Sequence, residues 1–177
     1  INENSFNDSR VRVVISDGRE YLHKSNDKYD LIVLDLIDPY GQASRLYTLE
    51  FYNLCRSKLN PNGILVTHAE SPYLLQEAFV RIYRTIENVF KYVRTYGAWI
   101  PSYAFYWMFI IASDYIDPAK ISQREIKRRI KERGISTKYY HAKLHKALFT
   151  LPKDILNAIK RKNVRLSTDE DPVKVDI

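Results

Sequence analysis

The sequence is poor in cysteine and contains no long apolar segment. Cys55 is the only cysteine among 177 residues, so no disulfide can form within the chain. A single thiol is typical of a reducing compartment, and we expect a cytoplasmic protein. No apolar run approaches the ~20 residues that span a bilayer, so we expect no membrane partner.

Glycine is scarce as well, and basic residues outnumber acidic ones. None of the five glycines forms a G-x-G-x-x-G motif, and the net charge is +7. A basic balance can indicate an anionic partner. It is more often a property of a solvated surface, and we expect no nucleic-acid partner. Hydrophobic residues make up 45% of the chain, which indicates a folded domain rather than a disordered segment.

Segments with strand periodicity alternate with segments of helical periodicity between residues 11 and 113. Strands are predicted at 11–17, 31–35, 64–69, 91–99 and 105–113. Helices are predicted at 19–25, 45–59 and 73–90, with a turn at 60–63. This alternation is typical of an α/β fold with a mostly parallel sheet. The last two strands are close in sequence, so we expect them to pair antiparallel at one edge.

After Pro118 the pattern becomes helical and basic. Helices are predicted at 121–134 and 138–152. The tail, residues 167–177, is polar, and we expect it to be either an extended edge piece or loose. We therefore separate residues 1–117, which hold the sheet, from residues 118–177, which form a helical C-terminal extension and tail of the same domain.

Three chemically active side chains lie at the carboxyl ends of predicted strands, namely Asp17, Asp35 and His68. Ligands of open α/β sheets bind at the carboxyl ends of the strands, so these side chains are candidates for one pocket. Asp38 comes shortly after Asp35, and two neighbouring carboxylates favour a cationic ligand. For Asp17 alone, a helix N-cap explains the aspartate equally well.

Four segments resemble one known family, in the same order and along nearly the whole chain. They are VISDGREYL at 14–22, YDLIVLDLIDPYGQASRLYTLEFY at 29–52, LNPNGILVTHAESPYL at 59–74 and KYYHAKLHKALFTLPK at 138–153. Together they resemble the polyamine aminopropyltransferases, which comprise spermidine synthase and its relatives. Residues 89–114 are most similar to the thermospermine-synthase-like branch. The resemblance implies a Rossmann-like fold of the methyltransferase type, with residues 1–117 as the C-terminal part of its catalytic domain.

The resemblance also implies an activity. An aminopropyl group would pass from decarboxylated S-adenosylmethionine to putrescine, agmatine or spermidine, and methylthioadenosine would be released. Decarboxylated S-adenosylmethionine is then a co-substrate, and no cofactor and no metal are expected besides it. Both substrates carry positive charge, so the pocket that holds them is expected to be acidic even on a basic protein.

Residue roles follow from the same resemblance. Asp35 corresponds to the catalytic aspartate, which accepts or relays a proton from the attacking amine. The nucleoside is expected to contact Asp17, Gly18, Gln42, Ala43 and Leu46. The amine is expected to contact Asp38, His68, Tyr103 and Trp107, and the indole of Trp107 is suited to a cation–π contact with an ammonium group.

Some positions depart from the family pattern. His68 stands where glutamine is frequent, Glu70 where glycine is frequent, and Gln42 where proline is usual. His68 either hydrogen-bonds an acceptor amine or packs at the strand end without touching it. The glycine-rich loop, the ribose-binding acid and the N-terminal oligomerisation domain of the family are missing. We therefore expect the C-terminal part of a longer enzyme, with a missing segment or chain that completes the sheet and a homo-oligomer as the complete form.

Other interpretations remain open. His141 and His145 have an i, i+4 spacing that can bind a metal, but no further ligand cluster accompanies them. Residues 38–40, DPY, are similar to a motif of methyltransferases that use S-adenosylmethionine, although Asp35 favours aminopropyl transfer. A degenerate domain that binds without catalysing is the remaining alternative.

Overall fold

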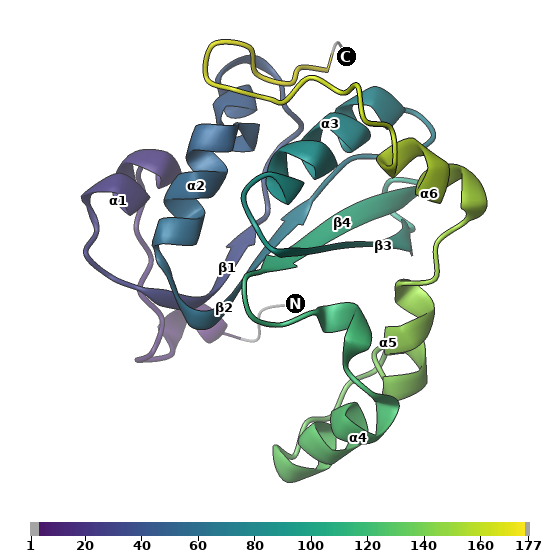
Figure 1. Cartoon of the computed structure of the whole chain (residues 1–177). Helices are drawn as coiled ribbons and strands as arrows, with labels where there is room; N and C mark the ends of the chain where they lie inside the picture. Colours follow the sequence, from purple (N-terminus) through teal and green to yellow (C-terminus); the bar gives the residue numbers. More distant parts are fainter. Residues whose placement is uncertain (1–3, 176–177) are drawn as a thin grey trace.

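The computed structural model describes residues 4–175 and shows an α/β fold around one four-stranded sheet (Figure 1). The strand order is β1-β2-β4-β3, with β1 at Tyr29–Leu34, β2 at Leu59–His68, β4 at Phe105–Ser113 and β3 at Tyr92–Ile100. β1 pairs parallel with β2, whereas β4 pairs antiparallel with both β2 and β3. The α/β class and the antiparallel edge are confirmed. Within residues 4–175 the sheet is mixed rather than mostly parallel, because only the β1–β2 pairing is parallel.

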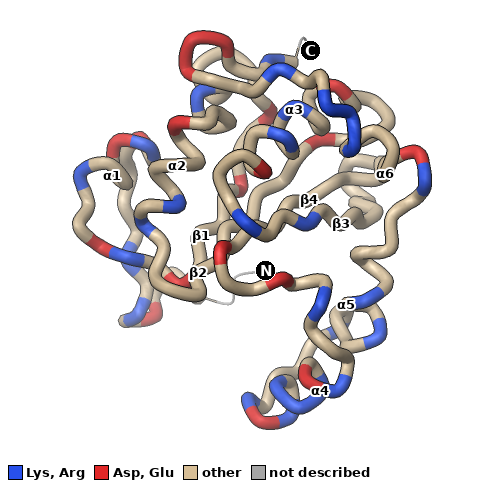
Figure 2. Tube along the Cα trace, in the orientation of Figure 1, with Lys and Arg blue, Asp and Glu red and all other residues tan. Residues whose placement is uncertain are grey.

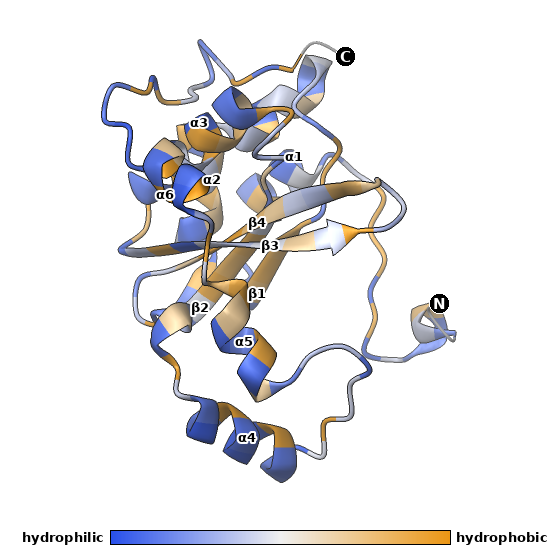
Figure 3. Ribbon diagram, turned by 90° about the vertical axis from the view of Figure 1, so that its right-hand side faces the viewer, coloured by the Kyte–Doolittle hydropathy of each residue, from blue (hydrophilic) through white to orange (hydrophobic). Residues whose placement is uncertain are grey.

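Helices lie on both sides of this sheet (Figures 1 and 3). The helices are α1 at Gly18–Lys24, α2 at Leu49–Ser57, α3 at Gln76–Glu87, α4 at Gln123–Glu132, α5 at Ala142–Leu148 and α6 at Lys153–Ile159. α2, α3 and α6 are grouped on one side, where α2 contacts β2 and α3 contacts β3 and β4. α4 and α5 project on the other side, and α5 contacts β3. Among the helices of the described part of the chain, none combines the length and the apolarity that a membrane span requires.

The core lies between the sheet and α3. The helix predicted at 73–90 buries one apolar face, with Phe79, Ile82 and Ile86 fully inaccessible to solvent. They belong to one cluster with Leu65 of β2 and Ile110 of β4. Burial of each such side chain contributes about 1.5–3 kcal/mol. This packing holds β2 and β4 in place, and the strand ends described below depend on it.

The outer strand β1 is buried on one face only. Ile32 and Leu34 are 8% and 7% exposed, whereas Leu31 and Val33 are 54% and 59% exposed. The predicted strand at 11–17 is wrong, since residues 11–15 have no assigned secondary structure and their apolar side chains are largely exposed. β-branched residues favour extended backbone, but a strand also needs a neighbour for its N–H and C=O groups. No such neighbour pairs with this segment among residues 4–175.

The helix predicted at 45–59 is two helices. A 3-10 helix covers Gly41–Tyr47, and α2 begins after Thr48, whose hydroxyl accepts a hydrogen bond from the Phe51 amide at 3.4 Å. The predicted turn at 60–63 lies inside β2, as an irregularity between the pairs Tyr29–Leu59 and Leu31–Ile64. In both places a residue type that favours a cap or a turn interrupts a helix or a strand. The chain does not reverse its direction there.

The C-terminal region is more ordered than predicted. α5 is shorter than the predicted helix at 138–152, because His141 caps it, and α6 was not predicted. Residues 167–175 of the tail are neither a sheet edge nor loose, since Val173 and Val175 are 2% and 4% exposed, and residues 176–177 lie outside the described part. The Val175 amide donates to the Pro39 carbonyl at 3.1 Å, and the Ser167 carbonyl accepts from the Leu49 amide at 2.8 Å. The tail therefore braces the loop after β1 and the start of α2 (Figure 1).

In the β3–β4 hairpin, Gly97 lies close to the Tyr106 ring, and a substitution at Gly97 can test this fold. A Cβ placed on Gly97 of β3 would lie 2.2 Å from Cζ of Tyr106 on β4. We expect Gly97→Ala to lower the free energy of unfolding by about 1–3 kcal/mol, measured by urea denaturation of the whole enzyme. Tyr106→Ala removes the obstructing ring, so Gly97→Ala should cost less in that background. An equal loss in both backgrounds would contradict the contact.

Candidate active site

The loop after β1 carries the two aspartates predicted to act on substrate. Asp35 directly follows β1 and is exposed, whereas Asp38 is half-buried and Pro39 is buried. The Asp38 carbonyl accepts from the Tyr40 amide at 2.6 Å, which tightens the turn. Gly41 then takes a φ of +54°, a left-handed conformation that glycine adopts without steric cost. The turn thus places both carboxylates at the carboxyl end of β1, where ligands of such sheets bind.

Four residues predicted to contact the nucleoside line one cavity of about 590 Å³. They are Asp17, Gln42, Ala43 and Leu46, and Arg19 and Arg45 complete the lining. Oδ1 of Asp17 also accepts the Glu20 amide at 2.8 Å, so the N-cap interpretation and the pocket interpretation apply to the same side chain. Gly18 is exposed beside Asp17, and a Cβ there would meet nothing within 4 Å.

A second group of polar side chains lies at the end of β2. Ligand atoms of Asp38, His68 and Glu70 all lie within 4.8 Å of one another, and we call these three residues the acid cluster. Glu70 is fully buried, and neither of its carboxylate oxygens has a hydrogen-bond partner within residues 4–175. Burial, and secondarily the charge of Asp38, raises the pKa of Glu70 to about 8. A buried carboxylate without a partner is costly, so this position favours a cationic ligand.

His68 is held by two aromatic side chains. Its Nε2 lies 2.8 Å from the Tyr47 hydroxyl, and its Nδ1 accepts from the Trp107 indole N–H at 3.4 Å. The Tyr47 hydroxyl donates to the Ile37 carbonyl at 2.6 Å, so His68 Nε2 is the donor in their contact. Burial lowers the pKa of His68 despite the nearby Asp38 and Asp35. Both ring nitrogens are therefore occupied in a neutral ring, which favours the packing option for His68 over direct contact with an amine.

An aromatic path leads from His68 to the surface. Trp107 stacks on His68 with ring centroids 6.4 Å apart, and Tyr103 meets Trp107 edge-on at 5.1 Å. Tyr103 is 55% exposed and lies in the turn between β3 and β4. The hairpin thus brings Trp107 next to His68 of the acid cluster and Tyr103 next to Trp107. Their electron-rich faces are suited to an ammonium chain.

The acid cluster fits an ammonium group better than a metal ion. Both nitrogens of His68 are engaged within the protein, which leaves only the Asp38 and Glu70 carboxylates as free ligands. The histidine pair in α5 is also engaged: His141 accepts the Leu144 amide, and His145 contacts the Tyr140 hydroxyl and the Pro118 carbonyl, each at 2.8 Å. These histidines support the helical extension.

Three functional candidates were absent from the sequence predictions. Tyr47 is fully buried between the strand ends, and burial raises its pKa, with further contributions from Glu70 and both aspartates. Arg19 lines the nucleoside cavity and pairs with Asp169 of the tail at 2.5 Å. Arg45 lines the same cavity. All three neighbour predicted site residues in the sequence, since Arg19 follows Gly18, and Arg45 and Tyr47 flank Leu46. That proximity was the available signal, whereas the contacts of Arg19 with Asp169 and of Tyr47 with His68 join distant segments.

Comparisons with known proteins all indicate one family. A sequence profile described as the spermine/spermidine synthase domain matches residues 1–121. The chain is 41% identical over 172 residues to a polyamine aminopropyltransferase of Korarchaeum cryptofilum (strain OPF8), covering 97% of this chain and 53% of that protein. It is 42% identical over 172 residues to a polyamine aminopropyltransferase of Sulfolobus acidocaldarius, covering 96% and 57%. The chain thus spans about half the length of the curated relatives it matches.

Solved structures are similar over most of the chain. Spermidine synthase from Thermotoga maritima superimposes with a TM-score of 0.75 at 29% identity, over 88% of this chain and 50% of that one. A spermidine synthase in complex with the transition state analogue AdoDATO gives a TM-score of 0.74 at 30% identity, over 88% and 51%. The Rossmann-like class is confirmed by these likenesses. Since the domain profile also covers more than half of the residues, this chain belongs to the spermine/spermidine synthase family.

Proposed function

We propose that this chain carries the catalytic part of a polyamine aminopropyltransferase. The observation that supports it best is the 3-10 helix Gly41–Tyr47, which contributes to two neighbouring sites. Gln42, Ala43 and Leu46 line a cavity of the size of a small-molecule site, and Tyr47 contacts His68 of the acid cluster. A transfer between two substrates requires this adjacency, because the donor carbon and the attacking nitrogen must meet.

The charges of the acid cluster match the proposed substrates. The donor is a sulfonium whose aminopropyl tail ends in an ammonium, and the acceptor is a polyamine. We assign the Asp38 and Glu70 carboxylates to an acceptor ammonium, because Glu70 is buried and has no protein partner among the described residues. Pairing with a cation would offset the cost of ionising Glu70 in this environment. Asp17 with Gly18 is assigned to the nucleoside, and Tyr103 with Trp107 to the amine path.

Asp35 is assigned the proton transfer. A polyamine nitrogen is protonated at neutral pH and becomes a nucleophile only after it loses a proton, which the Asp35 carboxylate accepts or relays to water. The nitrogen lone pair then forms a bond to the aminopropyl carbon attached to sulfur. The carbon–sulfur bond breaks and leaves its electron pair on sulfur. The products are the lengthened amine and neutral methylthioadenosine, so atoms and charges balance.

A mass-resolved transfer assay on the complete reading frame tests this function. The enzyme receives decarboxylated S-adenosylmethionine and S-adenosylmethionine together, with putrescine, agmatine and spermidine as acceptors. We expect one amine to gain one aminopropyl unit. A gain of one methyl group would assign the chain to methyl transfer, and no product from a folded enzyme would indicate a degenerate member.

The exposed face of β1 supports a further part of this proposal. Leu31 and Val33 expose apolar side chains on one face of β1, and Ile15, in the segment before α1, is 98% exposed. We propose that additional polypeptide covers this face in the whole enzyme, in line with relatives of about twice the length. A cytoplasmic location and assembly into a homo-oligomer stay predictions. The absence of a resident cofactor or metal is likewise still a prediction.

A further inference from the structure

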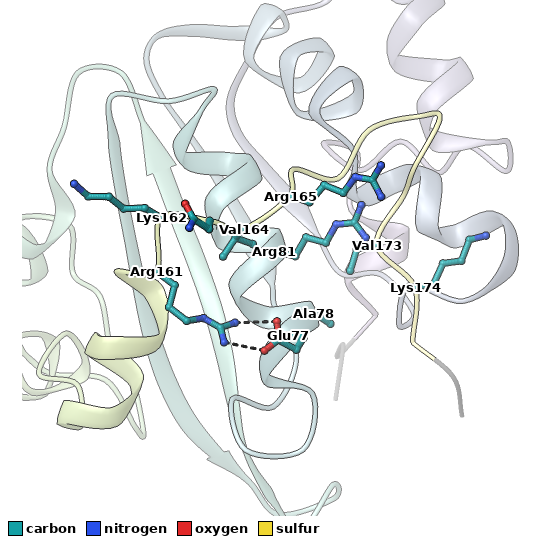
Figure 4. A pocket seen from close by; sticks show the side chains of 10 residues that line it. Glu77, Ala78, Arg81, Arg161, Lys162, Val164, Arg165, Val173 and Lys174 are labelled. Atoms are coloured by element: carbon teal, nitrogen blue, oxygen red, sulfur yellow. Dashed lines mark hydrogen bonds and ion pairs between the residues drawn. The ribbon is translucent and has the colours of Figure 1, made fainter.

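Two acids of the tail clamp it to the rest of the fold, and both belong to the acidic stretch at the top of Figure 2. Asp171 pairs with Arg81 of α3 and with Arg165, and these two arginines lie side by side in Figure 4. Asp169 instead faces α1 and the start of α2, where its carboxylate binds Arg19. This second clamp reaches the nucleoside cavity, because Arg19 belongs to the lining of that cavity.

The contact between Asp169 and Arg19 is bidentate. Two guanidinium nitrogens of Arg19 donate to the two carboxylate oxygens of Asp169, at 2.8 and 2.5 Å. The Thr48 hydroxyl donates to the same carboxylate at 2.7 Å, and the Asp169 amide donates to the Glu50 carboxylate at 2.9 Å. The side chains of the pair are only 27% and 28% exposed. Such a carboxylate is fixed in both position and orientation.

Arg19 is also tied to the opposite wall of the cavity. One of its guanidinium nitrogens donates to the Arg45 carbonyl at 3.1 Å, within the 3-10 helix Gly41–Tyr47 that supplies most of the lining. The hydrogen bond from Arg19 lowers the pKa of Asp169, and the hydrogen bond to Asp169 raises the pKa of Arg19. Both partners are therefore charged at neutral pH, and the ion pair persists there.

The charges around this cavity balance only when Asp169 is included. Among the described residues that line the cavity, Asp17 carries a carboxylate and Arg19 and Arg45 carry guanidinium groups. Asp169 supplies the second negative charge, and without it the cavity would have one positive charge in excess. The proposed donor is a sulfonium whose charged sulfur is bonded to the nucleoside. An uncompensated arginine in the wall would repel such a ligand.

We propose that Asp169 is a positioning residue that neutralises Arg19, so that the nucleoside cavity binds a cationic sulfonium nucleoside. The inference rests on the proposed function, because that function assigns the cavity to the nucleoside. Within residues 4–175 the cavity lining does not include Asp169, which therefore acts through Arg19. A clamp with a purely structural role would affect cationic and neutral nucleosides alike, whereas a compensating charge affects mainly the cation.

Calorimetric titration of the whole enzyme with decarboxylated S-adenosylmethionine and with methylthioadenosine tests this proposal. Methylthioadenosine has the same nucleoside and sulfur but no positive charge, so the measured quantity is the ratio of the two dissociation constants. We expect Asp169→Asn to shift this ratio about tenfold against the cationic donor. Asparagine keeps the shape of the side chain, and its oxygen can still accept from Thr48. The tail should therefore stay in place, which urea denaturation checks.

Asp171→Asn is the matched control, because it removes the same charge from the clamp that does not reach the cavity. We expect that variant to leave the ratio of dissociation constants unchanged. A rescue variant combines Asp169→Asn with Arg19→Gln and so removes the uncompensated cation as well. We expect this double variant to recover the wild-type ratio.

An unchanged ratio in Asp169→Asn, including equal weakening of both ligands, would reduce the clamp to a structural role and overturn the proposal. The same shift in Asp171→Asn would overturn it too, since the effect would then be general electrostatics. A double variant that keeps the shifted ratio would show that the shift does not act through Arg19. If the wild type binds neither ligand, the assignment of the cavity to the nucleoside fails, and this proposal fails with it.

Discussion

Asp35→Asn is expected to lower the turnover number of the whole enzyme about 100- to 10,000-fold, the range that a general base contributes. Asparagine keeps the size of the side chain but cannot accept the proton of the attacking amine at neutral pH. Asp35 is exposed at the end of β1, so the substitution should leave the fold intact. The measurement is steady-state transfer of the aminopropyl group, with turnover number and KM determined separately for the acceptor.

Asp27→Asn is the matched control, because Asp27 is also exposed and lies in the loop just before β1. We expect that variant to transfer at the wild-type rate. A proton-transfer role further predicts that the Asp35→Asn enzyme gains activity as the pH rises, since more of the amine is then already deprotonated. A near wild-type rate in Asp35→Asn would refute the assignment of Asp35.

Glu70→Gln is expected to raise the KM for the acceptor amine about 10- to 100-fold, which corresponds to the loss of a hydrogen bond to a charged group. The carboxylate of Glu70 is buried in the acid cluster and has no partner among residues 4–175. Glutamine preserves its shape but cannot ionise to pair with an ammonium group. Glu170→Gln, at an exposed position of the tail, is the control and should leave the KM unchanged. An unchanged KM in Glu70→Gln would exclude Glu70 from the amine site.

The stability of the free enzyme should depend on pH through the same carboxyl group. Burial raises the pKa of Glu70 from 4.5 to about 8 in the folded protein, so folding favours its neutral form. The contribution is fully present below pH 4.5 and is lost as the pH rises to about 8, at roughly 1.4 kcal/mol per pH unit. The Glu70→Gln protein should not show this loss of stability as the pH rises. Parallel stability curves for both proteins between pH 5 and 8, from urea denaturation, would contradict the raised pKa.

Local sequence patterns were sufficient to predict the four strands of the sheet and the helix that packs on them. Apolar spacing predicted α3 and the strands β1, β2, β3 and β4 because a buried face must repeat with the period of its own element. The position of Asp35 after an apolar strand likewise follows from neighbouring residues alone. The catalytic and binding roles carried by the family resemblance stay predictions, although the structure brings most of those side chains into two adjacent sites.

Elements that depend on distant partners were predicted poorly. The segment 11–17 has strand composition but no neighbouring strand within residues 4–175. The polar tail was predicted to be either an extended edge piece or loose, yet Asp169 holds both Arg19 and Thr48, and Val173 is buried. The contacts of Asp169 join residues more than a hundred positions apart, and no local periodicity encodes such contacts.

The identity of the family and the acids at the end of β1 could thus be recognised from the order of residues. The sequence could not show which polar group lacks a partner, because desolvation depends on everything packed around a group. Glu70 looked like a single departure from a pattern, and the fold makes it a fully buried carboxylate beside Asp38. For His68 the sequence allowed either contact with an acceptor amine or packing at the strand end, and the fold engages both of its nitrogens with Tyr47 and Trp107.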